Sequence, residues 1–239
     1  DIAAVARLAK SKGALTIVDN TFATPVLTNP LALGADAVSH SCTKYIGGHS
    51  DVIGGALICA DDAPAERLRF TQNAVGALAA PWDSFLLLRS TKTLHVRVQR
   101  HCENALAVAQ YLAKHPKVAW VQYAGLPENR YNAVAKKICP KGAGAVFTFG
   151  VKGGYEAGVD LVSRMKLFSR LANIGDTRSL VIHPASTTHR QLTDEQRAAA
   201  GAGADLVRLS IGLEDAADII GDPVSYTPLR AHETVLALV

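Results

Sequence analysis

Apolar residues recur at helical spacing at the start of the chain and then give way to a short continuous apolar run. Residues 2–12 have the spacing of an amphipathic helix that ends before Gly13. The apolar run at residues 14–18 follows directly and is typical of a buried parallel strand. Together they predict half of a βαβ unit. Because this unit starts at once from Asp1, with no Met before it, we expect the chain to begin in mid-domain, as a fragment of a longer protein.

The segments after residue 30 predict more of the same sheet. A short helix is expected at residues 31–36, followed by buried strands at 37–39 and 55–59. Lys44 falls in the loop between these two strands. Alternating strands and helices are typical of an α/β fold, in which we expect a mostly parallel sheet. We assign residues 1–104 to this first domain.

A long helical tract separates this domain from the rest of the chain. It is expected to begin after Asp83 or Ser84, both good N-cap residues, and to run with a bend to Lys114. Beyond it, short apolar runs alternate with helical patterns, which indicates an α+β domain over residues 105–222. Its expected strands lie at 118–123, 145–150 and 206–211, and one of its helices at 155–168.

Residues 223–239 do not continue this pattern. The helix expected after Asp215 should be amphipathic, but Pro223 and Pro228 interrupt it. We interpret residues 223–239 as a non-native tail derived from a frameshift, an adapter or a mis-assembled read.

Composition and charge narrow the classes of function. Hydrophobic residues make up 49% of the 239 residues, which suffices for a sizeable core. The net charge of +4 is spread without a long basic run, so we expect neither a nucleic-acid nor a membrane partner. The four cysteines lie far apart with no Cys-x-x-Cys spacing, which favours reduced thiols over disulfides or a metal site. A cytoplasmic location is therefore expected.

The candidate chemistry lies in the short segments VDNT and SCTKYIGGH. The amine of Lys44 can condense with an aldehyde, and the hydroxyls of Ser41 and Thr43 can bind a phosphate. Asp19 ends the first apolar strand, where open α/β sheets bind ligands, and its carboxylate can pair with a pyridinium nitrogen. These groups predict a site for pyridoxal phosphate.

Each of these residues also has a plainer interpretation. A lysine beside glycines is usually a solvated surface side chain. The hydroxyls of Ser41 and Thr43 could be ordinary turn hydroxyls that bond to the backbone.

Four segments, in order along the chain, resemble the Cys/Met-metabolism family of fold-type I pyridoxal-phosphate enzymes. They are VDNTFATP, SHSCTKYIGGHSDVIGG, NIGDTRSLVIHPASTTHRQL and VRLSIGLED. The resemblance implies an aspartate-aminotransferase-like α/β fold, with residues 1–104 as the C-terminal part of the cofactor-binding large domain and residues 105–222 as the small domain. It also implies a homo-oligomer, a dimer or homotetramer, with active sites at the subunit interfaces.

The resemblance assigns roles to the first group of candidate residues. Lys44 would bind pyridoxal phosphate covalently and then serve as the base that moves the α-proton of the substrate. Asp19 would keep the pyridine nitrogen protonated, and Ser41 and Thr43 would bind the phosphate.

Three further residues are implied near the carboxylate of an amino-acid substrate. Arg208 stands inside a strand pattern, where a guanidinium needs an anion or another good partner, and the resemblance makes it the ligand of the α-carboxylate. The alternative is a salt bridge to Glu214 or Asp215. Asn173 and Thr188 are also expected near this carboxylate.

Two histidines invite a metal or acid-base interpretation. His183 precedes Pro184 in a turn pattern, and His189 follows closely. We interpret both as structural residues, and no metal is expected.

Within the family, residues 140–146 and the run NIGD at 173–176 look most like O-acetylhomoserine sulfhydrylase. Lyases and synthases usually have Ser-Leu-Gly at the position of Asn173-Ile174-Gly175. The implied reaction replaces the acetate of O-acetylhomoserine by sulfide and gives homocysteine, in methionine and cysteine biosynthesis. A methionine or cystathionine γ-lyase and a cystathionine γ-synthase are the nearest alternatives.

A non-enzymatic alternative follows from features that the chain does not match. The resemblance implies an upstream glycine-rich phosphate loop, an aromatic residue stacked on the cofactor, and a tyrosine and an arginine that reach a neighbouring subunit. None has a counterpart in these 239 residues. The chain could therefore be an inactive scaffold that keeps only an assembly surface.

Overall fold

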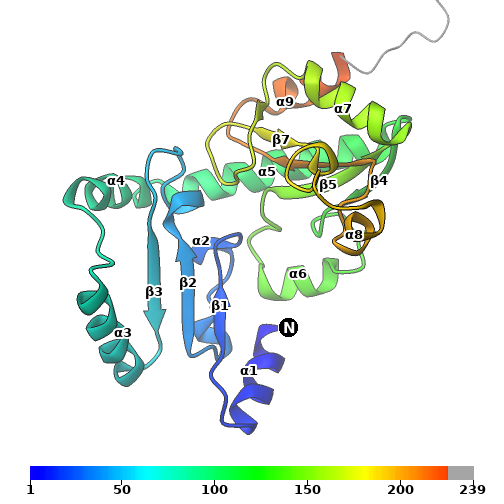
Figure 1. Ribbon diagram of the computed structural model, residues 1–239. Helices are drawn as coiled ribbons and strands as arrows, with labels where there is room; N and C mark the ends of the chain where they lie inside the picture. Colours follow the sequence, from blue (N-terminus) through cyan, green and yellow to red (C-terminus); the bar gives the residue numbers. More distant parts are fainter. Residues whose placement is uncertain (226–239) are drawn as a thin grey trace, which may run out of the picture.

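The computed structural model describes residues 1–225 and arranges them around two sheets. The first sheet has the strand order β1-β2-β3 and the second the order β4-β5-β8-β7-β6. A long helix, α5 (Leu94–Lys114), runs past both sheets (Figure 1). The α/β architecture expected from the sequence is confirmed.

The first sheet is formed by three short strands, β1 (Ile17–Asp19), β2 (Ala37–Ser41) and β3 (Gly55–Cys59). β1 and β2 are parallel, as expected, and Asp19 pairs with Ser39. β2 and β3 are antiparallel. A parallel pair at one edge is therefore joined to an antiparallel strand.

The expectation that the first strand is buried is wrong. Ile17 is 65% exposed and Leu15, just before the strand, is 71% exposed. β1 is an edge strand of the described sheet, and α1 (Ile2–Ser11) packs mainly on the turn at residues 31–33. An apolar run therefore does not by itself show that its side chains are covered.

Helices and helical turns connect and flank these strands. The turn at residues 31–33 replaces the longer helix expected at 31–36. The elements of this part are α1, α2 (Thr24–Leu27), the 3-10 turn η1 (Leu31–Leu33), the π-helical turn η2 (Cys42–Ile46), α3 (Asp62–Val75) and α4 (Pro81–Thr91).

The long helical tract begins earlier than expected and is divided in two. α4 starts at Pro81 with Ala80 as its N-cap, so neither Asp83 nor Ser84 has that role. Proline is well suited to a first helical turn because its missing N–H would have no partner there. The chain leaves α4 after Thr91, and α5 begins at Leu94 and ends at Lys114, as expected.

The second sheet contains the three strands expected from the sequence and two that were not expected. Neighbouring strands are antiparallel except for β6 and β7, which are parallel. Its strands are β4 (Val118–Gln122), β5 (Val146–Val151), β6 (Ser169–Arg170), β7 (Leu180–Ile182) and β8 (Leu206–Ser210). Its helices are α6 (Asn132–Ile138), α7 (Gly154–Arg164), η3 (Pro184–Ser186), α8 (Asp194–Ala199) and α9 (Ala216–Ser225).

The expected bounds of two helices need correction. α7 ends at Arg164 and not at Phe168, because the next N–H groups, from Lys166 to Phe168, donate to the carboxylate of Asp222. α9 passes through Pro223 to Ser225 and does not break at that proline. The rest of the expected tail lies outside the described residues.

The main core lies between α5 and the second sheet. Burying a large apolar side chain stabilises the fold by roughly 1.5–3 kcal/mol, so this interface holds the helix firmly. Its buried members include Val98, Ala105, Val108 and Leu112 on the helix and Phe147, Phe149, Val207 and Leu209 on the strands.

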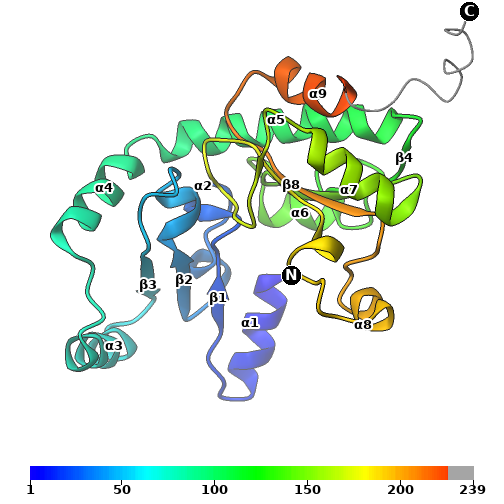
Figure 2. The ribbon, with the colours of Figure 1, turned by 45° about the horizontal axis from the view of Figure 1, so that its top comes forward.

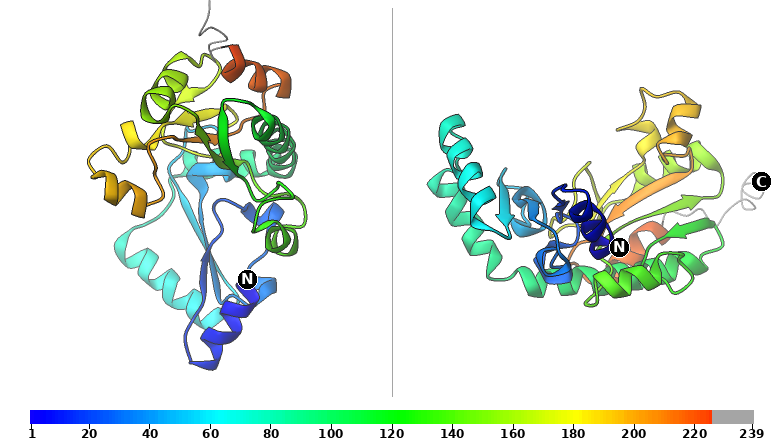
Figure 3. Two further views of the ribbon diagram at one scale, coloured as in Figure 1. Left: turned by 90° about the vertical axis from the view of Figure 1, so that its right-hand side faces the viewer. Right: turned by 90° about the horizontal axis from the view of Figure 1, so that it is seen from below.

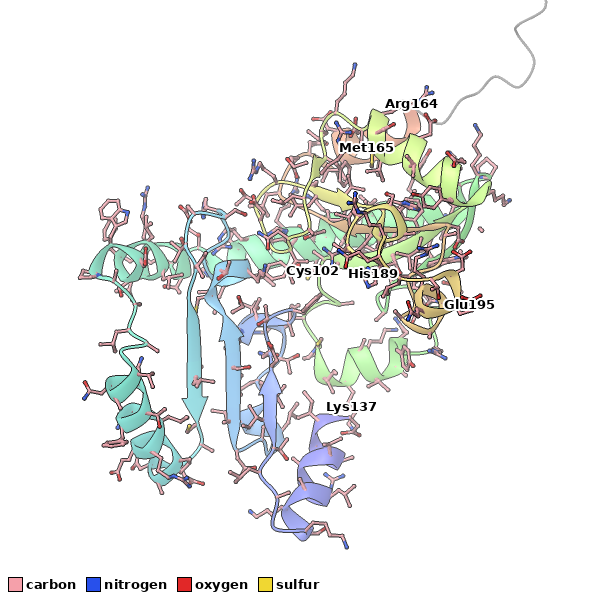
Figure 4. The ribbon with its side chains drawn as sticks, in the orientation of Figure 1. Cys102, Lys137, Arg164, Met165, His189 and Glu195 are labelled. Carbon is pink, nitrogen blue, oxygen red and sulfur yellow. The ribbon has the colours of Figure 1, made fainter. Side chains whose placement is uncertain are left out.

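α5 also contacts helical elements that flank the first sheet. It packs against α2, α4 and η2, and Figure 2 and the right-hand view of Figure 3 show the helix continuing along both parts. A second link joins Lys137 of α6 to Asp1 at the start of α1, with 2.7 Å between Nζ and Oδ2 (Figure 4). The expected boundary at residue 104 falls inside α5. None of the helices described is long and apolar enough to cross a membrane.

Candidate active site

The carboxyl ends of β1 and β2 are joined by Thr21. Its main-chain N–H donates to Oδ1 of Asp19 (3.0 Å), and its hydroxyl oxygen accepts the N–H of Ser41 (2.8 Å). Thr21 is only 8% exposed. Asp19 is expected at the ligand-binding end of its strand, whereas the link through Thr21 joins separate segments and has no signal in the local sequence pattern.

The electrostatics of this edge favour an ionised carboxylate. Hydrogen bonds from Thr21 lower the pKa of Asp19, and nearby His40 adds to the effect. Burial lowers the pKa of His40 below its usual value although Asp19 acts in the opposite direction. Asp19 is thus a negative group that can hold a protonated ring nitrogen.

Lys44 stands in a tight turn directly after β2. The turn η2 is π-helical, and Lys44 itself departs from helical geometry, with φ −92° and ψ −128°. The turn closes through the N–H groups of Gly47 and Gly48, which donate to Cys42 O (2.8 Å) and Lys44 O (2.7 Å). The lysine is half-buried. The expected position between β2 and β3 is confirmed.

Arg97 of α5 holds this turn through its guanidinium, which the sequence pattern does not reveal. Its guanidinium donates to Tyr45 O (2.6 Å), Ile46 O (3.2 Å) and Ser90 O (2.9 Å). The side chain is 6% exposed, and burial lowers its pKa. Gly48 is needed beside it, because a Cβ there would come within 2.4 Å of Nη1.

The two candidate phosphate hydroxyls differ in their surroundings. The hydroxyl of Thr43 donates to Gly54 O (3.4 Å) and accepts from Gly54 N–H (3.1 Å), as in the plainer interpretation of a turn hydroxyl. The hydroxyl of Ser41 has no hydrogen-bond partner among residues 1–225. Ser41 therefore has the freer hydroxyl for an anion.

Arg208 projects from β8, where it pairs with Thr148 of β5. Nη2 donates to the main-chain oxygen of Asn173 (3.3 Å). The alternative salt bridge is not formed, since the Glu214 carboxylate accepts from Ser179 and no carboxylate of the described residues pairs with Arg208. Burial lowers the pKa of this half-buried arginine. Its guanidinium can still accept an anionic partner.

Asn173 joins the two halves of the candidate site. Its side-chain oxygen accepts a hydrogen bond from Nζ of Lys44, while its main-chain oxygen accepts the bond from Arg208. Its Nδ2 donates to Oγ of Ser50 (3.1 Å). Residues 44, 173 and 208 are thus brought together from three distant segments.

Thr188 is not brought into this contact network. Its exposed hydroxyl pairs with Nδ1 of His189 (2.8 Å), a residue labelled in Figure 4. His183 is 1% exposed, and its ring nitrogens bond to Ser186 Oγ (2.9 Å) and Ala204 O (2.8 Å). These contacts support a structural role for His183.

The donor set fits pyridoxal phosphate in its chemistry. Asp19 offers an ionised carboxylate, Ser41 a free hydroxyl, and Lys44 a half-buried amine. The sequence family described as Cys/Met metabolism PLP-dependent enzyme matches residues 1–224.

The chain belongs to this family.

The relatives of this chain are named for several different activities. It is 47% identical to an L-methionine gamma-lyase of Fusobacterium nucleatum subsp. polymorphum, over 93% of this chain and 56% of that protein. It is 43% identical to O-acetyl-L-homoserine sulfhydrylase 1 of Thermus thermophilus, over 92% of this chain and 60% of that protein. The chain therefore spans little more than half the length of these relatives.

Solved structures confirm the fold. The crystal structure of cystathionine gamma synthase from Xanthomonas oryzae pv. oryzae, in complex with aminoacrylate and cysteine, matches with a TM-score of 0.89 and 44% identity. The match covers 94% of this chain and 58% of that one. The expected fold-type I architecture and the pyridoxal-phosphate family are both confirmed.

Proposed function

We propose that the protein catalyses the sulfhydrylation of O-acetylhomoserine, in which sulfide replaces acetate at the γ-carbon and homocysteine forms. The observation that carries this proposal is the contact of Asn173 with both Lys44 and Arg208. It places an amine that can move a proton next to a guanidinium that can hold a carboxylate. An α-amino acid offers both an α-proton for the amine and a carboxylate for the guanidinium.

Each residue has a defined task in this proposal. Bound pyridoxal phosphate would supply an electron sink that acidifies the α-carbon of the amino acid. Lys44 would hold the cofactor and move the proton at that carbon, and Asp19 would keep the ring nitrogen protonated. Ser41, with Thr43, would bind the phosphate, while Arg208 would hold the substrate carboxylate so that the α-hydrogen faces Lys44.

One feature of the site favours the sulfhydrylase, and the relatives include that activity among others. Asn173 occupies a position where lyase-like members carry serine, and its amide lies directly against the Lys44 amine. A relative named O-acetyl-L-homoserine sulfhydrylase covers 92% of the chain at 43% identity. A site that admits a small sulfur nucleophile while excluding water would favour replacement over elimination and hydrolysis to α-ketobutyrate.

A γ-lyase is the second candidate, because the methionine gamma-lyase relative has the higher identity, 47%. The two activities share their early proton transfers and differ in the fate of the substrate. Replacement gives homocysteine, whereas elimination gives α-ketobutyrate. Thr188 keeps its proposed place near the substrate in either case, although it has no contact with Arg208 here.

Product analysis tests the proposal. The purified protein is supplied with pyridoxal phosphate and O-acetylhomoserine, with and without sulfide, and products are quantified by mass spectrometry. Homocysteine should dominate with sulfide and should disappear in Lys44→Ala. α-Ketobutyrate as the main product in excess sulfide would favour the lyase. Lack of any visible absorbance from bound cofactor would favour the inactive scaffold.

A further inference from the structure

A chain of hydrogen bonds leads from a buried carboxylate to the Lys44 amine. Ser50 donates its hydroxyl proton to Oδ2 of Asp176, Asn173 donates from Nδ2 to Oγ of Ser50 (3.1 Å), and Lys44 donates to Oδ1 of Asn173. Ser50 follows the Lys44 turn, whereas Asp176 and Asn173 lie in the loop before β7. Two separate segments therefore meet at the reactive amine.

The chemistry of the groups fixes the direction of every bond in this chain. An ionised carboxylate only accepts, so the proton between Asp176 and Ser50 must come from Ser50. The Ser50 oxygen is then an acceptor, which selects the NH₂ side of the Asn173 amide. The carbonyl side of Asn173 must consequently face Lys44. Without this order an amide can turn by half a rotation and present either end.

Asp176, at the far end of this series of hydrogen bonds, is well suited to remain charged. Asp176 is 2% exposed, and it also accepts from the main-chain N–H of Arg178 (2.9 Å) and from Nη2 of Arg178 (3.2 Å). Burial raises the pKa of Asp176, but these hydrogen bonds and that of Ser50 outweigh it and hold the pKa below the usual value.

The backbone of Ser50 gives a second, independent indication. Its φ is +56°, a left-handed conformation that non-glycine residues adopt rarely and that is enriched at functional sites. This conformation costs stability, and the surrounding contacts must maintain it. It places the Ser50 hydroxyl between Asp176 and Asn173.

We propose that Ser50 and Asp176 are positioning residues that orient the Asn173 amide so that its oxygen holds the amine of Lys44 for reaction with the cofactor aldehyde. The inference rests on the proposed function, because it assumes that Lys44 reacts with pyridoxal phosphate. It adds two residues to the site that act through Asn173, and it accounts for an asparagine at position 173. A serine there is too short to bridge from Ser50 to Lys44.

The first test measures the rate at which Lys44 reacts with added pyridoxal phosphate. The full chain is mixed with the aldehyde, the product is reduced with borohydride at set times, and the Lys44 peptide is quantified by mass spectrometry. Ser50→Gly and Ser50→Ala should both slow labelling by roughly three- to tenfold, the factor expected for one net hydrogen bond. Ser163→Ala, at a surface serine that bonds to Asp160 O, is the matched control.

The pair of Ser50 variants separates the hydroxyl from the backbone strain. Glycine accepts a φ of +56° freely, whereas alanine does not. Equal slowing in both variants supports the role of the hydroxyl. Slowing in Ser50→Ala alone would assign the effect to strain and overturn the proposal.

A double-mutant cycle tests whether Ser50 acts through Asn173. In an Asn173→Ala background, Ser50→Gly should cause no further slowing. Asp176→Asn should slow labelling as Ser50→Gly does. The new NH₂ group can donate to the Ser50 hydroxyl, which could then donate to Asn173 and turn the amide of Asn173 the other way. Full slowing by Ser50→Gly in the Asn173→Ala background would contradict the proposal.

A readout without cofactor keeps the proposal separate from the proposed function. In the chain alone, the side-chain NH₂ protons of Asn173 should exchange with water more slowly than in Ser50→Gly, as measured by NMR. If the wild-type chain is not labelled at Lys44, the proposed function fails, and this exchange measurement decides the orientation alone. Equal exchange in both proteins would refute the orientation.

Discussion

Replacing Arg97 by methionine should destabilise the protein through the Lys44 turn. The change removes a guanidinium that donates to three main-chain oxygens, at Tyr45, Ile46 and Ser90, and to Thr93 Oγ1 (3.2 Å). Methionine has a similar length and can fill much of the space, so the principal loss is hydrogen bonding. The variant therefore tests whether the guanidinium holds the turn.

The magnitude follows from the carbonyl groups left behind. A buried acceptor without a partner costs roughly 1–3 kcal/mol, and partly exposed ones cost less because water reaches them. The bond to Tyr45 O is buried, and those to Ile46 O and Ser90 O are partly buried. Release of the guanidinium from its buried position offsets part of the loss. We expect the free energy of unfolding to fall by about 2–4 kcal/mol.

Thermal unfolding followed by circular dichroism measures this effect. For a chain of this size, each kcal/mol lowers the melting temperature by roughly 2–4 °C, which gives a decrease of roughly 5–15 °C. Arg97→Lys should lose about half as much, because a single ammonium cannot reach all three oxygens. Arg100→Met, at an exposed position on the same helix, should melt like wild type.

Two outcomes would refute this reasoning. One is a melting temperature for Arg97→Met within about 1 °C of wild type, since roughly 1 kcal/mol of lost stability would already shift it by more. The other is an Arg97→Lys variant as stable as wild type, which would mean that a point charge suffices. Either result would show that the several N–H donors of the Arg97 guanidinium do not hold the turn.

Further predictions concern the neighbouring residues. Arg208→Ala should weaken binding of an amino-acid ligand far more than binding of pyridoxal phosphate, measured by titration calorimetry, and equal losses would indicate a structural arginine. Gly48→Ala should lower the melting temperature, because the position has φ +78° and a Cβ would meet Arg97; Gly13→Ala, also at positive φ but in open space, is the control. The stabilising contribution of ionised Asp176 should be full above the ordinary carboxyl pKa of 3.8 and should decline as the pH falls through its lower folded pKa. The difference in melting temperature between wild type and Asp176→Asn should therefore be constant near neutral pH and shrink below 3.8, and a constant difference at all pH values would contradict this assignment.

Local patterns predicted the elements that depend on local chemistry. The bounds of the strand at residues 55–59 are correct, because a glycine precedes its apolar run and acidic residues follow it. The expectation that this strand is buried is wrong, since Leu57 is 59% exposed. The end of α5 at Lys114 was also correct, since Pro116 stands just beyond it. The break between α4 and α5 was expected only as a bend, because no proline or glycine marks residues 92 and 93.

The candidate site was predicted only in part, for a different reason. Asp19, Ser41 and Lys44 can be proposed from the sequence because their chemical groups suit the cofactor and because Asp19 ends an apolar strand, where open α/β sheets bind ligands. Arg97 bonds to Tyr45 and Ile46, which lie 52 and 51 positions before it. Ser50 bonds to Asp176, which lies 126 positions after it. Such pairings depend on how the two sheets are set against α5, which no local periodicity encodes.

The length of α5 has a consequence for how this protein can vary. One face of the helix is packed on the second sheet through residues such as Val108 and Leu112, while Arg97 holds the Lys44 turn near its other end. An inserted residue between Arg97 and Val108 would rotate one end against the other by about 100° and shift it by about 1.5 Å. Side chains in this stretch can be exchanged, but residues cannot be added or removed. Natural variation here should therefore consist of substitutions without insertions or deletions.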